Sequence, residues 1–176
     1  MNISLRNRIA LFYLSATSVI TLLLFVVIYQ VVYNTSFNNL DERLDFEALD
    51  ILDDLDMERD TVFFFDVSEW SEKEHSDVEV YPIFAEVTNI EKRSLKKTPN
   101  LKSNSLNIIP GNADNFNSRL SDKQVRQLQR PIINKKGSLI GYIVIAVPLE
   151  GAANVVAELK KVLFVSYPIL LIILFF

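Results

Sequence analysis

The side chains best suited to chemistry lie in one short polar stretch of the chain. Glu72-Lys73-Glu74-His75-Ser76-Asp77 places the only histidine among acids. Imidazole and carboxylate groups are suitable ligands for a divalent cation, so the candidate metal ligands are Glu72, Glu74, His75 and Asp77. A single histidine among acids in a loop is more often simply solvated, and the favoured interpretation is that no metal binds here.

Two further groups of side chains could bind a ligand, and each has a plainer interpretation. The first is a row of carboxylates at Asp41, Glu42, Asp45, Asp53, Asp54 and Asp56. These acids could hold Ca²⁺ or Mg²⁺ bridged to anionic lipid headgroups, although the solvated flank of a dimer explains them more simply. The second is a set of aromatic residues that could line a small-molecule pocket: Phe63, Phe64, Phe65, Trp70, Tyr81 and Phe84. Strand aromatics more often form core.

The element that must position these groups is an apolar stretch near the amino terminus. Ile9–Tyr33 carries no formal charge and contains fifteen Leu, Ile, Val or Phe residues. As a helix it would span roughly 38 Å, which exceeds the roughly 30 Å hydrocarbon core of a bilayer. A cleaved signal peptide would have a shorter apolar core and a small-residue cleavage site. We therefore predict an uncleaved transmembrane helix at residues 9–33.

A second uncharged run occupies Val162–Phe176, fifteen residues that stop short of a full span. We expect an incomplete second transmembrane helix at residues 162–176, with more protein beyond it. Arg6 and Arg8 precede the first span, which predicts a cytoplasmic amino terminus at residues 1–8. Residues 34–161 then form an extracytoplasmic domain of ordinary size. The absence of cysteine excludes disulfides and thiolate metal sites there.

Charge is divided into two opposed blocks. Residues 41–91 carry a net charge of −15, and residues 92–136 carry a net charge of +9. Such blocks face each other or lie on solvated surfaces more often than they bind nucleic acid. The basic block offers only Phe116 for stacking on a base, and an exported domain would not meet nucleic acid. Nucleic acid is therefore excluded as a partner.

The domain begins with an amphipathic helix over Phe37–Arg59. Apolar residues recur at helical spacing at Phe37, Leu40, Leu44, Ala48, Ile51 and Leu55, and Phe46, Leu49 and Leu52 widen this stripe. Neither Pro nor Gly separates this helix from the first span, so the two are predicted to form one rod. The stripe could be the seam with a second subunit or the face packed on the chain's own sheet, and both interpretations stay open.

Antiparallel strands follow. Strands are predicted at Thr61–Val67 and at Val78–Val87, the latter at an edge or a bulge because of Pro82. Thr88–Ser105 and Gly111–Ser118 are predicted as loops, with a short strand at Leu106–Ile109. Ser121–Gln124 fits a capping box for a short helix, although a strand through Val125–Ile133 is almost as plausible.

The strongest strand pattern comes last. Arg130–Ile133 and Ser138–Pro148 flank Asn134-Lys135-Lys136-Gly137, which predicts a hairpin. Leu139–Val147 is apolar on both faces and is predicted to be a central strand. A helix should start near Val155 and enter the membrane, with a kink at Pro168.

Several strings, in this order, resemble the input half of two-transmembrane bacterial sensor histidine kinases. They are Leu5–Tyr13, Leu40-Asp41-Glu42-Arg43-Leu44, Gly141–Leu149 and Leu159–Phe176. The similarity covers about 100 of the 176 residues, at the two ends of the chain. The resemblance implies an α+β chain with a PAS-like antiparallel sheet behind a long N-terminal helix, held as a homodimer in the bacterial cytoplasmic (inner) membrane.

The resemblance also implies a cytoplasmic kinase after Phe176 that acts on a response regulator and uses ATP and Mg²⁺. The chain itself holds no catalytic residues: His75 lies in an exported loop, and four glycines do not form a nucleotide lid. No cofactor is expected in this chain, whereas a small-molecule or cation ligand is possible.

The expected function is to pass a stimulus through the second span by a shift between two packings. The residues expected to transmit it are Asn34, Phe37, Leu40, Leu44, Leu159, Leu163 and Pro168. Two alternatives stay open: the input half of another two-span transducer, such as a chemoreceptor or nucleotide cyclase, and a non-signalling envelope protein that binds a partner.

Overall fold

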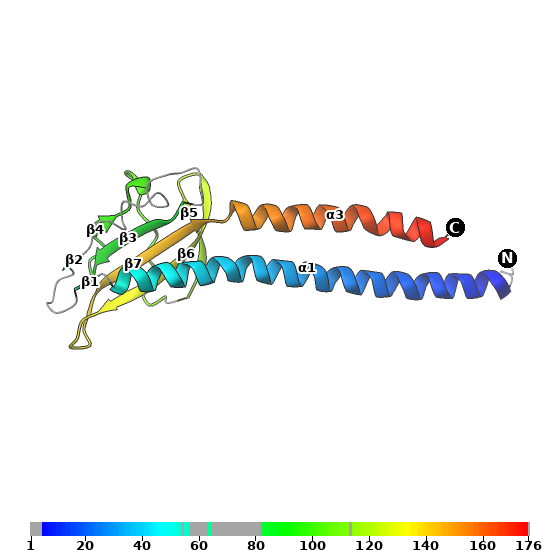
Figure 1. The fold of residues 1–176 in the computed structure, drawn as a ribbon, viewed down its shortest axis with the longest axis horizontal. Helices are drawn as coiled ribbons and strands as arrows, with labels where there is room; N and C mark the ends of the chain where they lie inside the picture. Colours follow the sequence, from blue (N-terminus) through cyan, green and yellow to red (C-terminus); the bar gives the residue numbers. More distant parts are fainter. Residues whose placement is uncertain (1–4, 54, 57–62, 65–81, 113, 176) are drawn as a thin grey trace. The chain divides into compact units, whose positions relative to one another are not determined.

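A computed structural model describes residues 5–53, 55–56, 63–64, 82–112 and 114–175 of the chain (Figure 1). The chain divides into two compact units. One unit holds residues 1–37 and 152–176, and the other holds residues 38–151. The elements confirm the predicted α+β class, with a long N-terminal helix and a five-stranded antiparallel sheet.

The N-terminal helix α1 runs from Leu5 to Asp53 without interruption (Figure 1). The predicted membrane segment and the predicted amphipathic helix are therefore one element, as the absence of Pro and Gly indicated. Within the described part of the chain, α1 is the helix whose length and apolar composition suit a membrane crossing. None of the residues in its apolar window is buried inside the protein, unlike those of a soluble core helix.

The end of α1 differs from the prediction of Arg59. The helix stops at Asp53, and Leu55–Asp56 forms strand β1, which pairs antiparallel with β2 at Phe63–Phe64. The last turn of α1 holds no basic residue, and carboxylates at a helix C-terminus oppose its dipole. Leu55 remains buried although it leaves the helix. Of the predicted strand Thr61–Val67, only Phe63–Phe64 lies within the described residues.

The five-stranded sheet has the order β4-β3-β7-β6-β5, and every neighbouring pair is antiparallel. Its strands are β3 (Phe84–Asn89), β4 (Ser94–Lys97), β5 (Phe116–Leu120), β6 (Lys123–Ile133) and β7 (Leu139–Pro148). The prediction of a central strand covered on both faces is confirmed, because β7 pairs with β3 and β6 along its edges and contributes side chains to the apolar clusters on both faces of the sheet. Helix α3 (Glu150–Phe175) begins two residues after β7 ends and contains Pro168.

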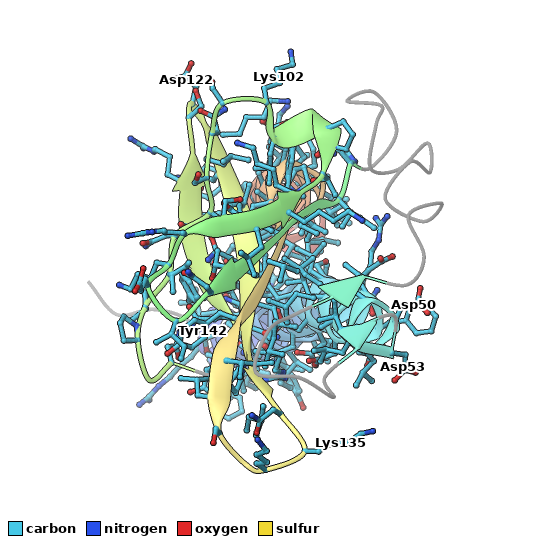
Figure 2. The ribbon with its side chains drawn as sticks, turned by 90° about the vertical axis from the view of Figure 1, so that its left-hand side faces the viewer. Asp50, Asp53, Lys102, Asp122, Lys135 and Tyr142 are labelled. Carbon is cyan, nitrogen blue, oxygen red and sulfur yellow. The ribbon has the colours of Figure 1, made fainter. Side chains whose placement is uncertain are left out.

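The β6–β7 hairpin is also as predicted. Gly137 adopts φ 79°, a left-handed conformation that glycine tolerates best. The Asn134 side chain closes the turn, since its Oδ1 accepts hydrogen bonds from the amides of Lys136 at 3.0 Å and Ser138 at 2.8 Å. Figure 2 shows Lys135 at the tip of this hairpin and Asp122 at the β5–β6 turn, at opposite ends of the sheet.

Several predictions between the helix and the hairpin are wrong. Strand β3 is internal and Pro82 precedes it, so the proline does not place it at an edge. The predicted loop at 88–105 contains β4 and the 3-10 helix η2 (Pro99–Leu101). The predicted loop at 111–118 contains the start of β5. Of the two interpretations of the segment that starts at Ser121, the strand is confirmed as part of β6 and the capping box is wrong, because Ser121 lies in the tight β5–β6 turn at φ 52°.

Each face of the sheet buries its own apolar cluster. On the helix face, Leu44, Ala48 and Ile51 of α1 pack with inward residues of β3, β6 and β7. On the other face, Leu101 and Leu106 pack against Phe84 of β3, Val125 of β6 and Val144 of β7. The sheet is therefore a middle layer with the helix on one side and residues 98–112 on the other.

Candidate functional site

Two ion pairs fix α1 to strand β6. Arg126 donates from Nε to Oδ1 of Asp41 at 2.7 Å and from an η nitrogen to Oδ2 at 2.9 Å, a bidentate contact. The other η nitrogen of Arg126 donates to Oδ1 of Asn117 at 2.9 Å. The side chains keep 18% and 25% of their full exposure for Arg126 and Asp41. Partial burial and forked geometry make this contact stronger than an ordinary surface pair.

The second ion pair lies one helical turn further along α1. An η nitrogen of Arg130 lies 2.6 Å from Oδ1 of Asp45, with side-chain exposures of 36% and 46%. Arg126 and Arg130 share a face of β6 because side chains alternate along a strand. The fully buried Leu44 lies between the two aspartates on the helix. The acidic block (residues 41–91) and the basic block (residues 92–136) therefore contact each other at these two ion pairs, as one of the interpretations of the sequence predicted.

The apolar stripe of α1 packs on the sheet of its own chain. Leu44, Ala48 and Ile51 are buried in the helix-face cluster, with Leu40 and Leu52 partly buried against it. On the outward side, Phe46 and Leu49 keep 69% and 64% of their exposure. The narrow stripe therefore covers the sheet together with Leu52, whereas Phe46 and Leu49, the other two residues that widen it, remain on the surface.

The opposite face of the sheet holds an irregular segment, residues 104–112, which we call the strap. Leu106–Ile109 was predicted to be a strand, but it is irregular. Its backbone groups form hydrogen bonds with buried side chains of the sheet instead of with a neighbouring strand. The Leu106 amide donates to Glu86 Oε2 at 2.7 Å, and the Ile109 amide donates to Gln129 Oε1 at 2.9 Å. Gln129 Nε2 donates to the carbonyl oxygens of Ile109 and Asn112 at 2.9 and 3.1 Å.

The sequence analysis missed these polar anchors. Gln127 and Gln129 are fully buried, and Gln127 Nε2 donates to the Asn107 carbonyl. Their signal in the sequence was the alternation Arg126-Gln127-Leu128-Gln129-Arg130, in which amides occupy two successive positions on one face of a predicted strand. Uncharged amides on a covered face require hydrogen-bond partners. The strap provides them for both polar atoms of Gln129 and for Nε2 of Gln127, whereas Oε1 of Gln127 has no partner among the described residues.

In the helix pair, the predicted transmission residues of α1 lie along a row of aromatic rings. Tyr29 and Tyr33 stack with ring centroids 6.2 Å apart, and Tyr33 and Phe37 lie 4.6 Å apart. Asn34 accepts a hydrogen bond from Gln30 Nε2 at 3.1 Å. These contacts are one helical turn apart and stiffen α1 over residues 29–37.

A polar contact joins the two helices. The hydroxyls of Ser18 and Tyr167 share a hydrogen bond of 2.7 Å, and the Tyr167 hydroxyl lies 3.3 Å from the Ser18 carbonyl oxygen. The Tyr167 ring packs edge-on against Phe25 at 6.1 Å. Because one tyrosine contacts α1 through both its ring and its hydroxyl, it fixes the register of α3 against α1. The sequence analysis named Pro168 as a transmission residue and did not identify its neighbour Tyr167.

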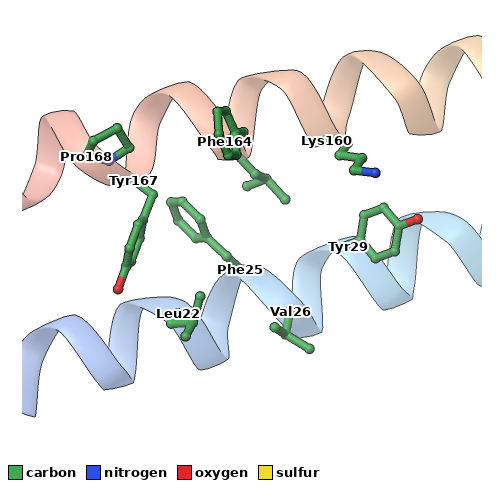
Figure 3. Close-up of a pocket in the computed structure, with 9 residues that line it drawn as sticks. Leu22, Phe25, Val26, Tyr29, Lys160, Phe164, Tyr167 and Pro168 are labelled. Carbon is green, nitrogen blue, oxygen red and sulfur yellow. The ribbon is translucent and has the colours of Figure 1, made fainter.

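Beside this contact, the helices enclose a groove of about 760 Å³. Leu163 and Pro168, two of the predicted transmission residues, line it on the α3 side (Figure 3). Its lining is completed by Leu22, Phe25, Val26, Tyr29, Lys160, Phe164 and Tyr167. Leu159 is half-buried in α3.

The predicted transmission residues therefore fall in both units. Leu40 and Leu44 belong to the sheet-bearing unit, and Asn34, Phe37, Leu159, Leu163 and Pro168 belong to the helix pair. The candidate metal ligands Glu72, Glu74, His75 and Asp77 lie outside the described residues, as do Phe65, Trp70 and Tyr81. Phe84, the predicted pocket residue whose side chain is described, is buried in core. Within the described ranges, no three His, Cys, Asp or Glu side chains cluster as metal ligands would.

No family model matches this chain, and no curated protein matches it. The class that the structure defines is an α+β protein in which one long apolar helix continues into the core of an antiparallel sheet. Its polar contacts anchor elements to one another.

Proposed function

We propose that this chain is the membrane-anchored sensor portion of a two-component histidine kinase, with the sheet-bearing unit outside the cytoplasm. The observation that carries the proposal is the continuity of elements at both ends of that unit. Helix α1 runs unbroken from the apolar stretch to buried Leu44, and central strand β7 leads within two residues into α3. A repacking of the sheet against α1 is thereby passed to both helices through rigid elements.

The architecture of the sheet supports a PAS-like sensor fold. Of the five strands in the sheet, the first and last in chain order, β3 and β7, lie side by side, and a helix covers one face. The exposed Phe46 and Leu49 offer an apolar surface on α1 that suits a second copy of the chain. A homodimer fits this surface, because a twofold seam needs only one self-complementary patch.

The mechanism is a bias between two packings. Arg6 and Arg8 favour a cytoplasmic amino terminus in the inner membrane, and α3 then returns the chain to the cytoplasm as the second span. A stimulus that changes how α1 sits on the sheet shifts α3 against α1. A coupling of about 1–3 kcal/mol changes the equilibrium roughly 5–150-fold, which suffices for a switch. In this proposal ATP, Mg²⁺ and the response regulator act at the kinase part of the protein.

The topology can be tested because the chain contains no cysteine. Single variants Ser103→Cys, in an exposed loop, and Ser4→Cys, near the amino terminus, are treated with a membrane-impermeant maleimide in spheroplasts. We expect Ser103→Cys to be labelled in intact spheroplasts and Ser4→Cys only after permeabilisation. The reverse pattern, or labelling of both in intact spheroplasts, would refute the exported location.

Signal transfer is tested in a chimera in which this chain is fused after Phe176 to the cytoplasmic half of a histidine kinase. Arg126→Gln replaces the unidentified stimulus, because it releases α1 from β6. We expect it to change autophosphorylation at least fivefold. Three glycines inserted after Lys160 should abolish this response, whereas three glycines inserted between Lys135 and Lys136, at the hairpin tip, should preserve it. An unchanged response with the first insertion would exclude transmission through α3.

A further inference from the structure

The groove between α1 and α3 is polar at one end and apolar along the rest of its length. Figure 3 shows Lys160 and Tyr29 at one end, with Tyr167 and Pro168 toward the other. Lys160 is the one charged residue among the nine that line the groove. From Lys160 to Pro168 the groove follows eight residues of α3, or about 12 Å. Its shape and polarity resemble those of an amphiphile.

The polar end lies where the membrane surface is expected. Lys160 and Lys161 are the last charges before the apolar run of α3, and Tyr29 and Tyr33 provide the aromatic residues that favour a membrane–water boundary. A lysine at this level extends its ammonium group to the headgroups while its methylenes cover apolar surface. The groove therefore starts at the headgroups and continues into hydrocarbon.

We propose that this groove binds an anionic phospholipid, with the phosphate on Lys160 and one acyl chain lying along Phe25, Leu163 and Phe164. Charge complementarity favours this occupant, since the lining offers one cation and no carboxylate to neutralise it. A second copy of the chain seated symmetrically in the groove would bring two Lys160 ammonium groups together in an apolar seam, which is costly.

The lysine must supply most of the lipid preference. An acyl chain that moves from the bilayer into the groove exchanges one apolar environment for another. Its burial therefore contributes little to a preference for one lipid over another. One lysine near the membrane surface favours an anionic over a zwitterionic headgroup by roughly fivefold. Lys161 is a matched control, because it lies next in sequence, does not line the groove and pairs with Glu158 at 3.7 Å.

The test uses tryptophan quenching by brominated acyl chains. The full chain carrying Phe164→Trp in a Trp70→Phe background has its single tryptophan on the groove and is reconstituted in phosphatidylcholine bilayers with a fixed phosphatidylglycerol fraction. The two lipids are brominated in turn at equal bromine content. We expect brominated phosphatidylglycerol to quench more strongly, Lys160→Gln to lower this preference about fivefold, and Lys161→Gln to leave it within twofold.

A second pair of variants tests the groove without changing charge. Val26 lines it and Val27 does not, and both keep 57% of their exposure. Val26→Phe should fill the groove and reduce quenching by brominated phosphatidylglycerol, whereas Val27→Phe should not. Equal quenching by the two lipids, or equal effects of Lys160→Gln and Lys161→Gln, would overturn the lipid site. Protection from both brominated lipids would overturn it in favour of a protein occupant.

The inference rests on the proposed function only in requiring that both helices are embedded in a bilayer. Cysteine labelling at Ser4 and Ser103 tests the crossing of α1 independently, and quenching of the Phe164→Trp variant by either brominated lipid shows that α3 is embedded. A lost lipid preference with normal labelling and normal output from the chimera therefore refutes the lipid site and leaves the sensor proposal intact.

Discussion

The bidentate Arg126–Asp41 pair should contribute far more to holding α1 on the sheet than the Arg130–Asp45 pair. The first pair has two close contacts and retains 18% and 25% side-chain exposure, whereas the second has one close contact at 36% and 46%. Hydrogen bonds to charged groups contribute about 1.5–3 kcal/mol when shielded, and exposed ion pairs about 0.2–1 kcal/mol. We expect coupling free energies of about 2 and about 0.5 kcal/mol.

Double-mutant cycles with Asp41→Asn and Arg126→Gln, and with Asp45→Asn and Arg130→Gln, isolate these two values. The contact between Arg126 and Asn117 is lost in both branches of its cycle and cancels. Hydrogen–deuterium exchange of the β6 and β7 amides in the full chain, reconstituted in bilayers, reports the opening equilibrium of the sheet. The expected couplings correspond to about 30-fold and about twofold in exchange rate.

Comparing the two coupling free energies tests this prediction. Equal couplings would mean that burial and bidentate geometry do not determine how α1 is held. A larger coupling for Asp45–Arg130 would refute the expectation that the Asp41–Arg126 pair is the stronger of the two.

Three further predictions use the same exchange measurement. Gly141→Ala places a Cβ 2.1 Å from a backbone oxygen of β3 and should destabilise the sheet by about 3 kcal/mol, whereas Gly151→Ala meets open space and should be neutral or stabilising. Equal effects of the two substitutions would contradict the close approach of β3 and β7. Leu44→Ala should cost about 2–5 kcal/mol and Phe46→Ala under about 0.5 kcal/mol in the monomer, and a large Phe46 effect that depends on protein concentration would reveal a subunit seam. Gln129→Leu should speed exchange of the Ile109 amide without exposing β7, and unchanged exchange there would show that the strap is held by other contacts.

The parts of the fold that sequence predicted correctly depend on local rules. The β6–β7 hairpin follows from Gly137 and from the apolar run at Leu139–Val147, and the continuity of α1 follows from the absence of Pro and Gly. The class of the fold, α+β with an antiparallel sheet, follows from these elements. Each depends on neighbours within a few residues, which is the range over which periodicity and turn chemistry act.

The parts that could not be predicted depend on distant partners. Asp41 and Arg126 are separated by 85 residues, and no local pattern distinguishes them from the other charges of their blocks. Leu106–Ile109 has the composition of a strand, yet Glu86, Gln127 and Gln129 satisfy its backbone from about 20 residues away. Tyr167 likewise reaches Ser18 across 149 residues. Propensity is overridden wherever tertiary partners satisfy the backbone or bury the charge.

Strand β6 joins the two faces of the sheet into one system. Arg126 and Arg130 point toward α1, and Gln127 and Gln129 between them point toward the strap. If the register of β6 slipped by one residue, the glutamine amides would face the helix and the arginine guanidinium groups would face the strap. The register of β6 is therefore specified from both sides at once, and β6 pairs with β7 along most of its length. The strap, β6 and α1 are thus linked by direct side-chain contacts, and β7, the partner of β6, is followed within two residues by α3.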